Sequence, residues 1–249
     1  MAERFRFFVT GTDTGAGKTV VTAAIACLAV EAGQRLAAFK PAQTGVAPDE
    51  PGDLEFVRAA AGASPLLTTA YGYRLREPLA PAVAAQREGV RIDPAAILEQ
   101  YEGLASEADV VLVEGAGGLL APLADGYLMA DLARELNIPM LVVARPGLGT
   151  LNHTALTVEA ARSRAIEVAG VVISGYPAEP DLATRTNPRL MVELTGAPLL
   201  GVLPHIEGLS TDKLRTAGLA QVARDALAPA LGGCFDSGAF LDRESVGAA

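Results

Sequence analysis

The sequence predicts a three-layer α/β fold in which helices cover both faces of a mostly parallel sheet. Two observations predict it. Apolar runs of strand length alternate with helical segments along the chain, as they do in parallel sheets. Residues 11–19, GTDTGAGKT, fit the pattern G-x-x-x-x-G-K-S/T of phosphate-binding loops. Together they indicate a single α/β domain of the P-loop NTPase type.

The first elements are a strand at 5–10, the phosphate loop, and a helix at 20–31 that is rich in Ala, Val, Ile and Leu. The glycines allow backbone N–H groups to turn toward an anion, and the helix start adds its positive dipole end. Lys18 would reach the β- and γ-phosphates, and the Thr19 hydroxyl would contact magnesium. An ordinary glycine-rich turn is the alternative, which the flanking strand and helix disfavour.

The remaining elements continue the alternation. A second strand is expected at 35–40, helices at 53–61 and 94–108, and a strand buried on both faces at 110–113. Later strands are expected at 140–144, 168–174 and 199–203, and later helices at 128–136, 152–164, 189–195 and 214–227. No repeat or linker divides the chain, so we expect one domain over 1–249 with a weakly structured tail at 232–249.

Composition narrows the class of protein. The net charge of -9 and the lack of a basic run argue against nucleic acid as a partner. Apolar stretches fall short of the ~20 residues that span a bilayer, and no leader-like segment precedes the first strand. We therefore expect a soluble, cytoplasmic protein without a membrane partner. Cys27 and Cys234 lack metal-ligand spacing and are expected to be idle thiols.

Two charged residues stand at the ends of strands beside the phosphate loop, at the edge where ligands of such folds collect. Lys40 precedes Pro41, and Glu114 follows the apolar run 110–113. A second lysine near one phosphate would offset the charge that builds up as the γ-phosphoryl group transfers. A carboxylate at this edge suits magnesium. An exposed strand-end lysine and a surface carboxylate are the less favoured alternatives.

Four segments carry further information: residues 11–19, Lys40-Pro41 with Thr44-Gly45, residues 113–118 (VEGAGG) and residues 148–153 (LGTLNH). Together they resemble the dethiobiotin synthetases, the ATP-dependent enzymes that close the ureido ring in biotin synthesis. The resemblance extends from residue 5 to about residue 210. It implies ATP as co-substrate, Mg²⁺ as cofactor and a homodimer with the substrate site at the subunit interface.

The resemblance also implies a role for each matching residue. Thr14, Lys18 and Lys40 would be catalytic, and magnesium would be held by Thr19, Asp53 and Glu114. The nucleotide would contact Gly15, Ala16, Gly17, Lys18, Thr19, Val20, Asp53, Glu114, Gly115, Ala116 and Gly117, with Ser174, Gly175, Pro204, His205 and Ile206 near the base. The diamine would contact Lys40 and Thr44, and its carboxylate would contact Gly149, Thr150, Leu151 and Asn152 of the neighbouring subunit. For Asp53, a plain helix N-cap is the alternative.

The implied reaction begins when one amine of 7,8-diaminononanoate takes up CO₂. The resulting carbamate accepts the γ-phosphoryl group, and the second amine then closes the ring. This chain departs from the family at two places: Gly15-Ala16 stands where many members have Glu-Val, and Ser174-Gly175 stands where the family often has Asn-Asp. A hydroxyl and a glycine offer fewer fixed donors and acceptors to a base. We therefore expect other nucleoside triphosphates to support turnover to a degree comparable with ATP.

Two other functions fit the same loop. One is an ATP-dependent amidoligase of the cobyrinate-synthase kind, which usually needs a glutaminase domain with a nucleophilic cysteine. The other is a partitioning or positioning ATPase, whose loop carries an additional lysine where this chain has Thr12, Asp13 and Thr14. Both stay open as alternatives at this stage.

Overall fold

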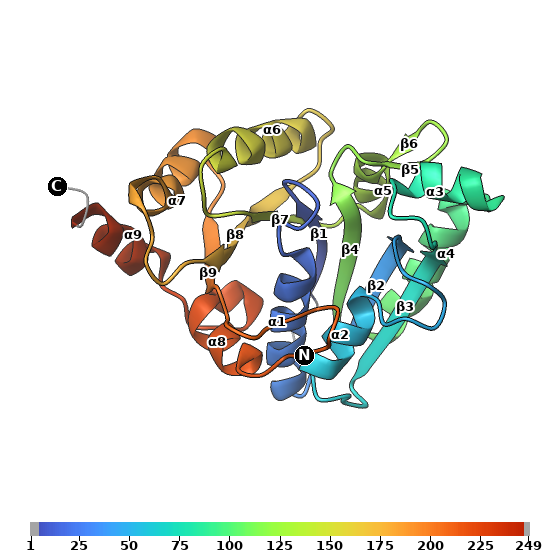
Figure 1. The fold of residues 1–249 in the computed structure, drawn as a ribbon, viewed down its shortest axis with the longest axis horizontal. Helices are drawn as coiled ribbons and strands as arrows, with labels where there is room; N and C mark the ends of the chain where they lie inside the picture. The colour runs from blue at the N-terminus through green and yellow to red at the C-terminus, as the bar shows by residue number, and fades with distance from the viewer. Residues whose placement is uncertain (1–4, 247–249) are drawn as a thin grey trace.

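Seven parallel strands form one sheet in the computed structural model, which describes residues 5–246 (Figure 1). The strand order is β3-β2-β4-β1-β7-β8-β9. The strands of this sheet are β1 Phe5–Gly11, β2 Leu36–Gln43, β3 Leu67–Arg74, β4 Val110–Gly118, β7 Met140–Ala144, β8 Val168–Tyr176 and β9 Leu199–Pro204. A separate antiparallel hairpin consists of β5 Pro122–Ala124 and β6 Tyr127–Leu128. The expected parallel α/β sheet is confirmed.

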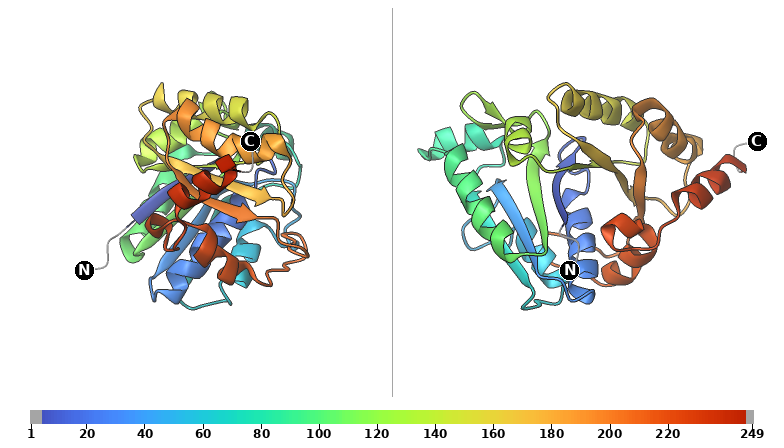
Figure 2. Two further views of the ribbon diagram at one scale, coloured as in Figure 1. Left: turned by 90° about the vertical axis from the view of Figure 1, so that its left-hand side faces the viewer. Right: turned by 180° about the vertical axis from the view of Figure 1, so that it is seen from behind.

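Helices cover both faces of the sheet, and this confirms the three expected layers (Figure 2). One face is covered by α1 Lys18–Glu31, α2 Asp53–Ala60 and α8 Leu219–Ala226. The other is covered by α3 Pro81–Glu88, α4 Pro94–Glu107, α5 Met129–Leu136, α6 Thr150–Arg162 and α7 Leu182–Thr195. Side chains alternate between the faces along each strand, as Phe7 and Phe8 do on β1. Among the described residues, no helix is long and apolar enough to cross a membrane.

Several elements differ from the sequence-based expectation. β4 extends to Gly118 and β2 to Gln43, so segments expected as loops continue the strands. Neither β3 nor α3 was expected. β3 is a half-exposed edge strand, and its sequence has no apolar run. Helix α8 starts at Leu219 and not at the expected residue 214. Leu214 has a positive φ of 49°, which does not belong to a right-handed helix.

Helix α7 begins at Leu182 instead of 189, and Pro188 lies inside it. Proline lacks the N–H that would bond to the carbonyl four residues earlier. That carbonyl belongs to Thr184, and the Tyr176 hydroxyl lies 3.5 Å from it. A partner from another element therefore contacts the carbonyl that proline leaves unbonded, which sequence reasoning about proline did not foresee.

The segment 232–249, which was expected to be a weakly structured tail, contains helix α9, Ser237–Val246. A short 3₁₀ turn, η1, precedes this segment at Pro229–Leu231. Phe240 of α9 packs edge-on against Tyr176, with ring centroids 5.7 Å apart. This apolar contact with the core gives the tail a surface to order against. The last residues, 247–249, lie outside the described part.

Candidate active site

The phosphate loop connects β1 to α1 at the carboxyl edge of the sheet. Gly15 and Gly17 have φ of 72° and 98°, a left-handed region that favours glycine. A Cβ at Gly17 would lie 2.7 Å from the Cβ of Ser174. Lys18 begins the helix, and its Nζ donates to the carbonyl of Gly117 at 2.8 Å. The loop therefore requires glycine at both positions and directs Lys18 toward the end of β4.

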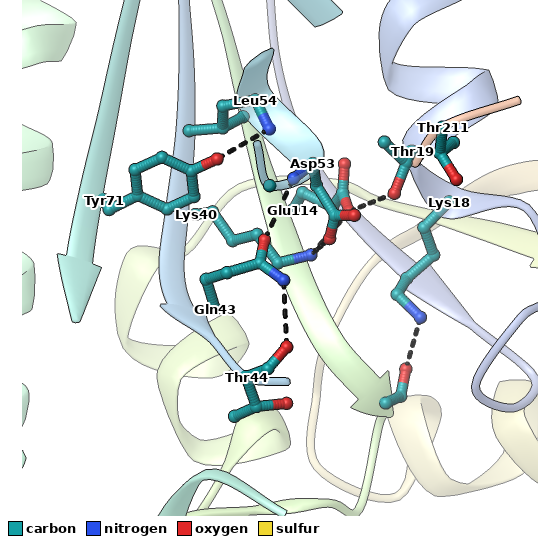
Figure 3. Close-up of polar contacts among 12 residues, drawn as sticks. Lys18, Thr19, Lys40, Gln43, Thr44, Asp53, Leu54, Tyr71, Glu114 and Thr211 are labelled. Carbon is teal, nitrogen blue, oxygen red and sulfur yellow. Dashed lines mark hydrogen bonds and ion pairs between the residues drawn. The ribbon is translucent and has the colours of Figure 1, made fainter. Parts of the chain in front are cut away.

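Beside the loop, an ion cluster joins β2, β4 and α2 (Figure 3). The Nζ of Lys40 lies 2.7 Å from Oε1 of Glu114 and pairs with the carboxylate of Asp53. The hydroxyl of Thr19 donates to the same Oε1 at 2.9 Å. The structure thus brings together Lys40 and the three residues expected to hold magnesium.

Burial and neighbouring charges shift the protonation of this cluster. Burial alone would lower the pKa of Lys40, but the Glu114 and Asp53 carboxylates outweigh it and raise that pKa. Burial likewise would raise the pKa of Asp53, and Lys40 outweighs it and lowers that pKa. For Lys18, burial and the charge of Lys40 together lower the pKa. Lys18 and Lys40 together balance the two carboxylates of the ion cluster, so these four side chains alone do not offset the charge of a triphosphate.

The oxygen donors of the cluster fit a magnesium ion. Oε2 of Glu114 is buried and has no hydrogen-bond partner, which is unusual for a carboxylate oxygen. Magnesium is a hard cation bound through one or two carboxylates, with water and substrate phosphates completing its shell. Within residues 5–246 there is no group of three or more His, Cys, Asp or Glu side chains that could hold a metal. Two carboxylates and the Thr19 hydroxyl therefore form the available donor set.

A cavity of about 420 Å³ joins the phosphate loop to the ion cluster. It is lined by Thr14, Gly15, Gly17, Lys18, Thr19, Val20, Lys40, Gln43, Thr44, Asp53, Glu114, Ala116, Gly117 and Thr211. Two expected nucleotide residues are not among its lining residues: Ala16 is buried, and a Cβ at Gly115 would lie 3.3 Å from the Phe8 ring. Most of the residues expected to bind the phosphates thus share one cavity.

The residues expected near the base lie beside this cavity, at the ends of β8 and β9. Ser174 abuts the phosphate loop at Gly17, and Gly175 has a φ of 81°. The segment 204–206, at the end of β9, is hydrogen-bonded to β8, because the His205 N–H donates to the Tyr176 carbonyl at 2.7 Å.

The segment 149–152 begins helix α6 and is not among the described residues that line the cavity of its own protomer. Gly149 precedes the helix with a φ of 91°. The adjoining Leu148 is 94% exposed. The turn before it is held by Asn187, whose Nδ2 donates to the Pro146 carbonyl at 2.8 Å. Within the segment, Gly149 and Asn152 are exposed and Thr150 is buried, so only part of it is accessible to a second protomer.

Three residues near the loop and cavity were not singled out from the sequence. Gln43 lies between two residues that were, Lys40 and Thr44, so its position was a usable signal. Arg145 follows strand β7 and donates to the Thr14 carbonyl at 2.5 Å. Thr211 comes from the long segment after β9, and no local pattern marked it.

Known proteins match most of this chain. A protein-family model described as an AAA domain matches residues 6–213. The ATP-dependent dethiobiotin synthetase BioD of Saccharopolyspora erythraea is 53% identical over 226 residues, covering 90% of this chain and 96% of the relative. The protein of the same name from Frankia casuarinae is 49% identical over 237 residues, covering 94% and 97%.

Solved structures with a similar fold are more distant in sequence. The cell division ATPase MinD of Pyrococcus furiosus has a TM-score of 0.58 and 18% identity, covering 99% of this chain and 100% of that one. A ParA family ATPase from Chlorobium tepidum has a TM-score of 0.59 and 14% identity, covering 90% and 97%. At such identities the likeness shows the fold alone.

Proposed function

The chain belongs to the ATP-dependent dethiobiotin synthetase family, and we propose that it closes the cyclic urea of dethiobiotin from 7,8-diaminononanoate, CO₂ and ATP. The observation that carries the proposal is the convergence of Lys18, Lys40, Asp53 and Glu114 on the cavity at the phosphate loop. Relatives that bear this name are 45–53% identical over most of the chain. The function is a C–N bond-forming ligase activity in biotin synthesis.

The proposed reaction has three steps. A nitrogen of the diamine bonds to CO₂ and loses a proton, which gives a carbamate. A carbamate oxygen then attacks the γ-phosphorus of ATP, and the bond from that phosphorus to ADP breaks. The second amine attacks the carbamate carbon, loses a proton, and phosphate leaves. No protein nucleophile is required, so positioning and charge stabilisation by Lys18 and Lys40 supply the catalysis.

Magnesium is the proposed cofactor, with Thr19, Asp53 and Glu114 as its protein ligands. The unpartnered Oε2 of Glu114 and the excess of negative charge in the ion cluster, where two carboxylates face the single cation of Lys40, support this assignment. When bound, the ion would offset negative charge on the β- and γ-phosphates. Lys40 pairs with the Asp53 carboxylate and with Oε1 of Glu114, so it would share both carboxylates with the proposed metal.

The diamine is proposed to lie against Lys40 and Thr44, with its carboxylate at residues 149–152 of a second copy. Backbone N–H groups at a helix start suit a carboxylate, and α6 begins at Thr150. A homodimer is supported by exposed leucines on and beside α6 and α7, which are Leu148, Leu156, Leu182, Leu190 and Leu194. Sedimentation tests the oligomeric state, and a monomer at micromolar protein concentration would contradict the dimer.

A cytoplasmic location is also proposed, in keeping with two free thiols.

One assay tests the function. The purified protein is mixed with ATP, Mg²⁺, bicarbonate and the diamine, and ADP and the ring product are measured. We expect ADP release that depends on the diamine and equals the product formed. ADP release without the diamine would instead favour an ATPase switch, and release that depends on a carboxylic acid and ammonia would favour an amidoligase.

A further inference from the structure

The buried amide of Gln43 bridges two segments that flank the cavity (Figure 3). Its Oε1 accepts a hydrogen bond from the backbone N–H of Asp53 at 3.1 Å. Its Nε2 donates to the backbone carbonyl of Thr44 at 3.1 Å. Gln43 is only 5% exposed. One side chain therefore holds the first turn of α2, which carries a proposed metal ligand, against the proposed diamine-binding residue.

The first turn of α2 is held by side chains throughout. The Leu54 N–H donates to the Tyr71 hydroxyl at 2.9 Å, and the Gly52 N–H donates to Oε2 of Glu55 at 2.6 Å. The Tyr71 hydroxyl donates in turn to that Oε2 at 2.6 Å. The first N–H groups of a helix have no partner within the helix, so these contacts fix where α2 begins. Asp53 stands at this start, and the direction of its carboxylate depends on them.

An amide is suited to this bridge because its two ends are chemically different. The oxygen only accepts hydrogen bonds, and the nitrogen only donates them. Rotating the amide of Gln43 by half a turn would therefore place like groups together at both Asp53 and Thr44. The bridge has a single satisfied orientation, which fixes the distance and direction between the two segments.

We propose that Gln43 is a positioning residue that couples the binding of magnesium nucleotide to the binding of the diamine. It acts through the backbones of Asp53 and Thr44 and does not itself contact the reacting atoms. The inference rests on the proposed function, because Asp53 and Thr44 have their roles only there.

Two variants and one control separate this role from simple packing. Gln43→Met keeps the length of the side chain and removes both hydrogen bonds. Gln43→Glu still accepts from the Asp53 N–H but no longer donates to Thr44. The control is Gln100→Met, which removes another glutamine whose Nε2 donates to a backbone carbonyl, that of Tyr71, at 3.2 Å. This bond lies outside the cavity lining.

The measurements are magnesium-dependent binding of a non-hydrolysable ATP analogue by calorimetry, and the kcat and diamine KM of the whole enzyme. In Gln43→Met, we expect the magnesium concentration for half-maximal nucleotide binding and the diamine KM each to rise about tenfold, the size of effect that one lost hydrogen bond produces. In Gln43→Glu, only the diamine KM should rise, with nucleotide binding within about twofold of the wild type.

An unchanged magnesium dependence in Gln43→Met, an unchanged diamine KM in Gln43→Glu, or equal shifts in Gln100→Met would each overturn the proposal. Should Gln43→Met not fold, Gln43→Glu decides alone through its diamine KM. The nucleotide measurement needs no diamine, so it is read independently of the reaction. Failure of the wild type to release ADP in response to the diamine overturns the proposed function instead.

Discussion

The ammonium of Lys40 lies 2.7 Å from Oε1 of Glu114, and both side chains are buried. The two residues come from the neighbouring strands β2 and β4, which pair in parallel. A buried charge is costly unless a partner in the same interior offsets it. Each member of this pair therefore depends on the other, and the pairing holds a lysine at the wall of the cavity.

Replacing Lys40 should lower both the turnover rate and the stability of the protein in the absence of magnesium. In Lys40→Met, we expect turnover to fall on the order of a hundredfold, as when one donor to a developing negative charge is removed. Without magnesium, the free energy of unfolding should fall by about 3 kcal/mol, because Glu114 and Asp53 lose their buried cation. Added Mg²⁺ should restore stability more in this variant than in the wild type. Coupled ADP assays and urea unfolding measure the two effects.

Lys213→Met is the matched control for that experiment, because Lys213 is exposed and lies outside the ion cluster. It should change neither turnover nor unfolding appreciably. Turnover close to that of the wild type in Lys40→Met would remove Lys40 from the mechanism.

Lys18 should matter for the nucleotide more than for the fold. Its pKa is lowered by burial and by the charge of Lys40, and a phosphate bound beside it would act in the opposite direction. In Lys18→Met, we expect turnover to fall on the order of a hundredfold or more, with little change in the melting temperature. Calorimetry with an ATP analogue checks the accompanying loss of nucleotide affinity. Undiminished binding would contradict a phosphate contact.

The preference for adenine should be weak. The family resemblance implies that Ser174 and Gly175 would lie near the base, and neither offers a fixed amide or carboxylate. We expect CTP and GTP to support turnover within about a hundredfold of ATP. Comparing kcat/KM for the three donors under saturating diamine gives the answer. A larger preference for ATP would show that other residues read the base.

The Glu55 carboxylate should stabilise the protein at neutral pH but not in acid. Burial alone would raise its pKa, and hydrogen bonds from Tyr71 and Gly52 outweigh this and lower it. A lowered folded pKa means that the stabilisation is complete above the unfolded value of about 4.3 and is lost as pH falls through the folded value.

Glu55→Gln tests this dependence. Because the side chain is 39% exposed, we expect a loss on the order of only 1 kcal/mol at pH 7. The difference from the wild type should vanish near pH 3. Urea unfolding at both pH values measures it, and an equal difference at both would show that the charge of Glu55 is not responsible.

The two thiols should differ in reactivity. Burial raises the pKa of Cys27 to about 11, so at pH 8 roughly one Cys27 thiol in a thousand is ionised, and the thiolate is the reactive form. Cys234 is exposed. Iodoacetamide at pH 8 should therefore label Cys234 in the native protein and both residues in denaturant. Rapid native labelling of Cys27, seen by peptide mass spectrometry, would contradict its burial.

Features encoded by neighbouring residues could be predicted from the sequence. The phosphate loop depends on glycines and a lysine within residues 11–19, and its strand and helix follow from apolar runs beside it. Lys40 and Glu114 were identifiable because each directly follows an apolar run of strand length. The edge strand β3 and the first part of helix α7, up to Pro188, were not predicted, because contacts with other elements stabilise them.

The sequence by itself determined the fold class, the phosphate loop and the family. Only the tertiary structure decided which polar groups meet: Lys40 and Glu114 are 74 positions apart, and Gln43 and Asp53 are 10 positions apart. Helices and strands each have a short side-chain period, so their apolar patterns can be recognised within a short stretch of sequence. Ion pairs and amide bridges arise from the register of strands and the placement of α2, which depend on packing across the whole sheet.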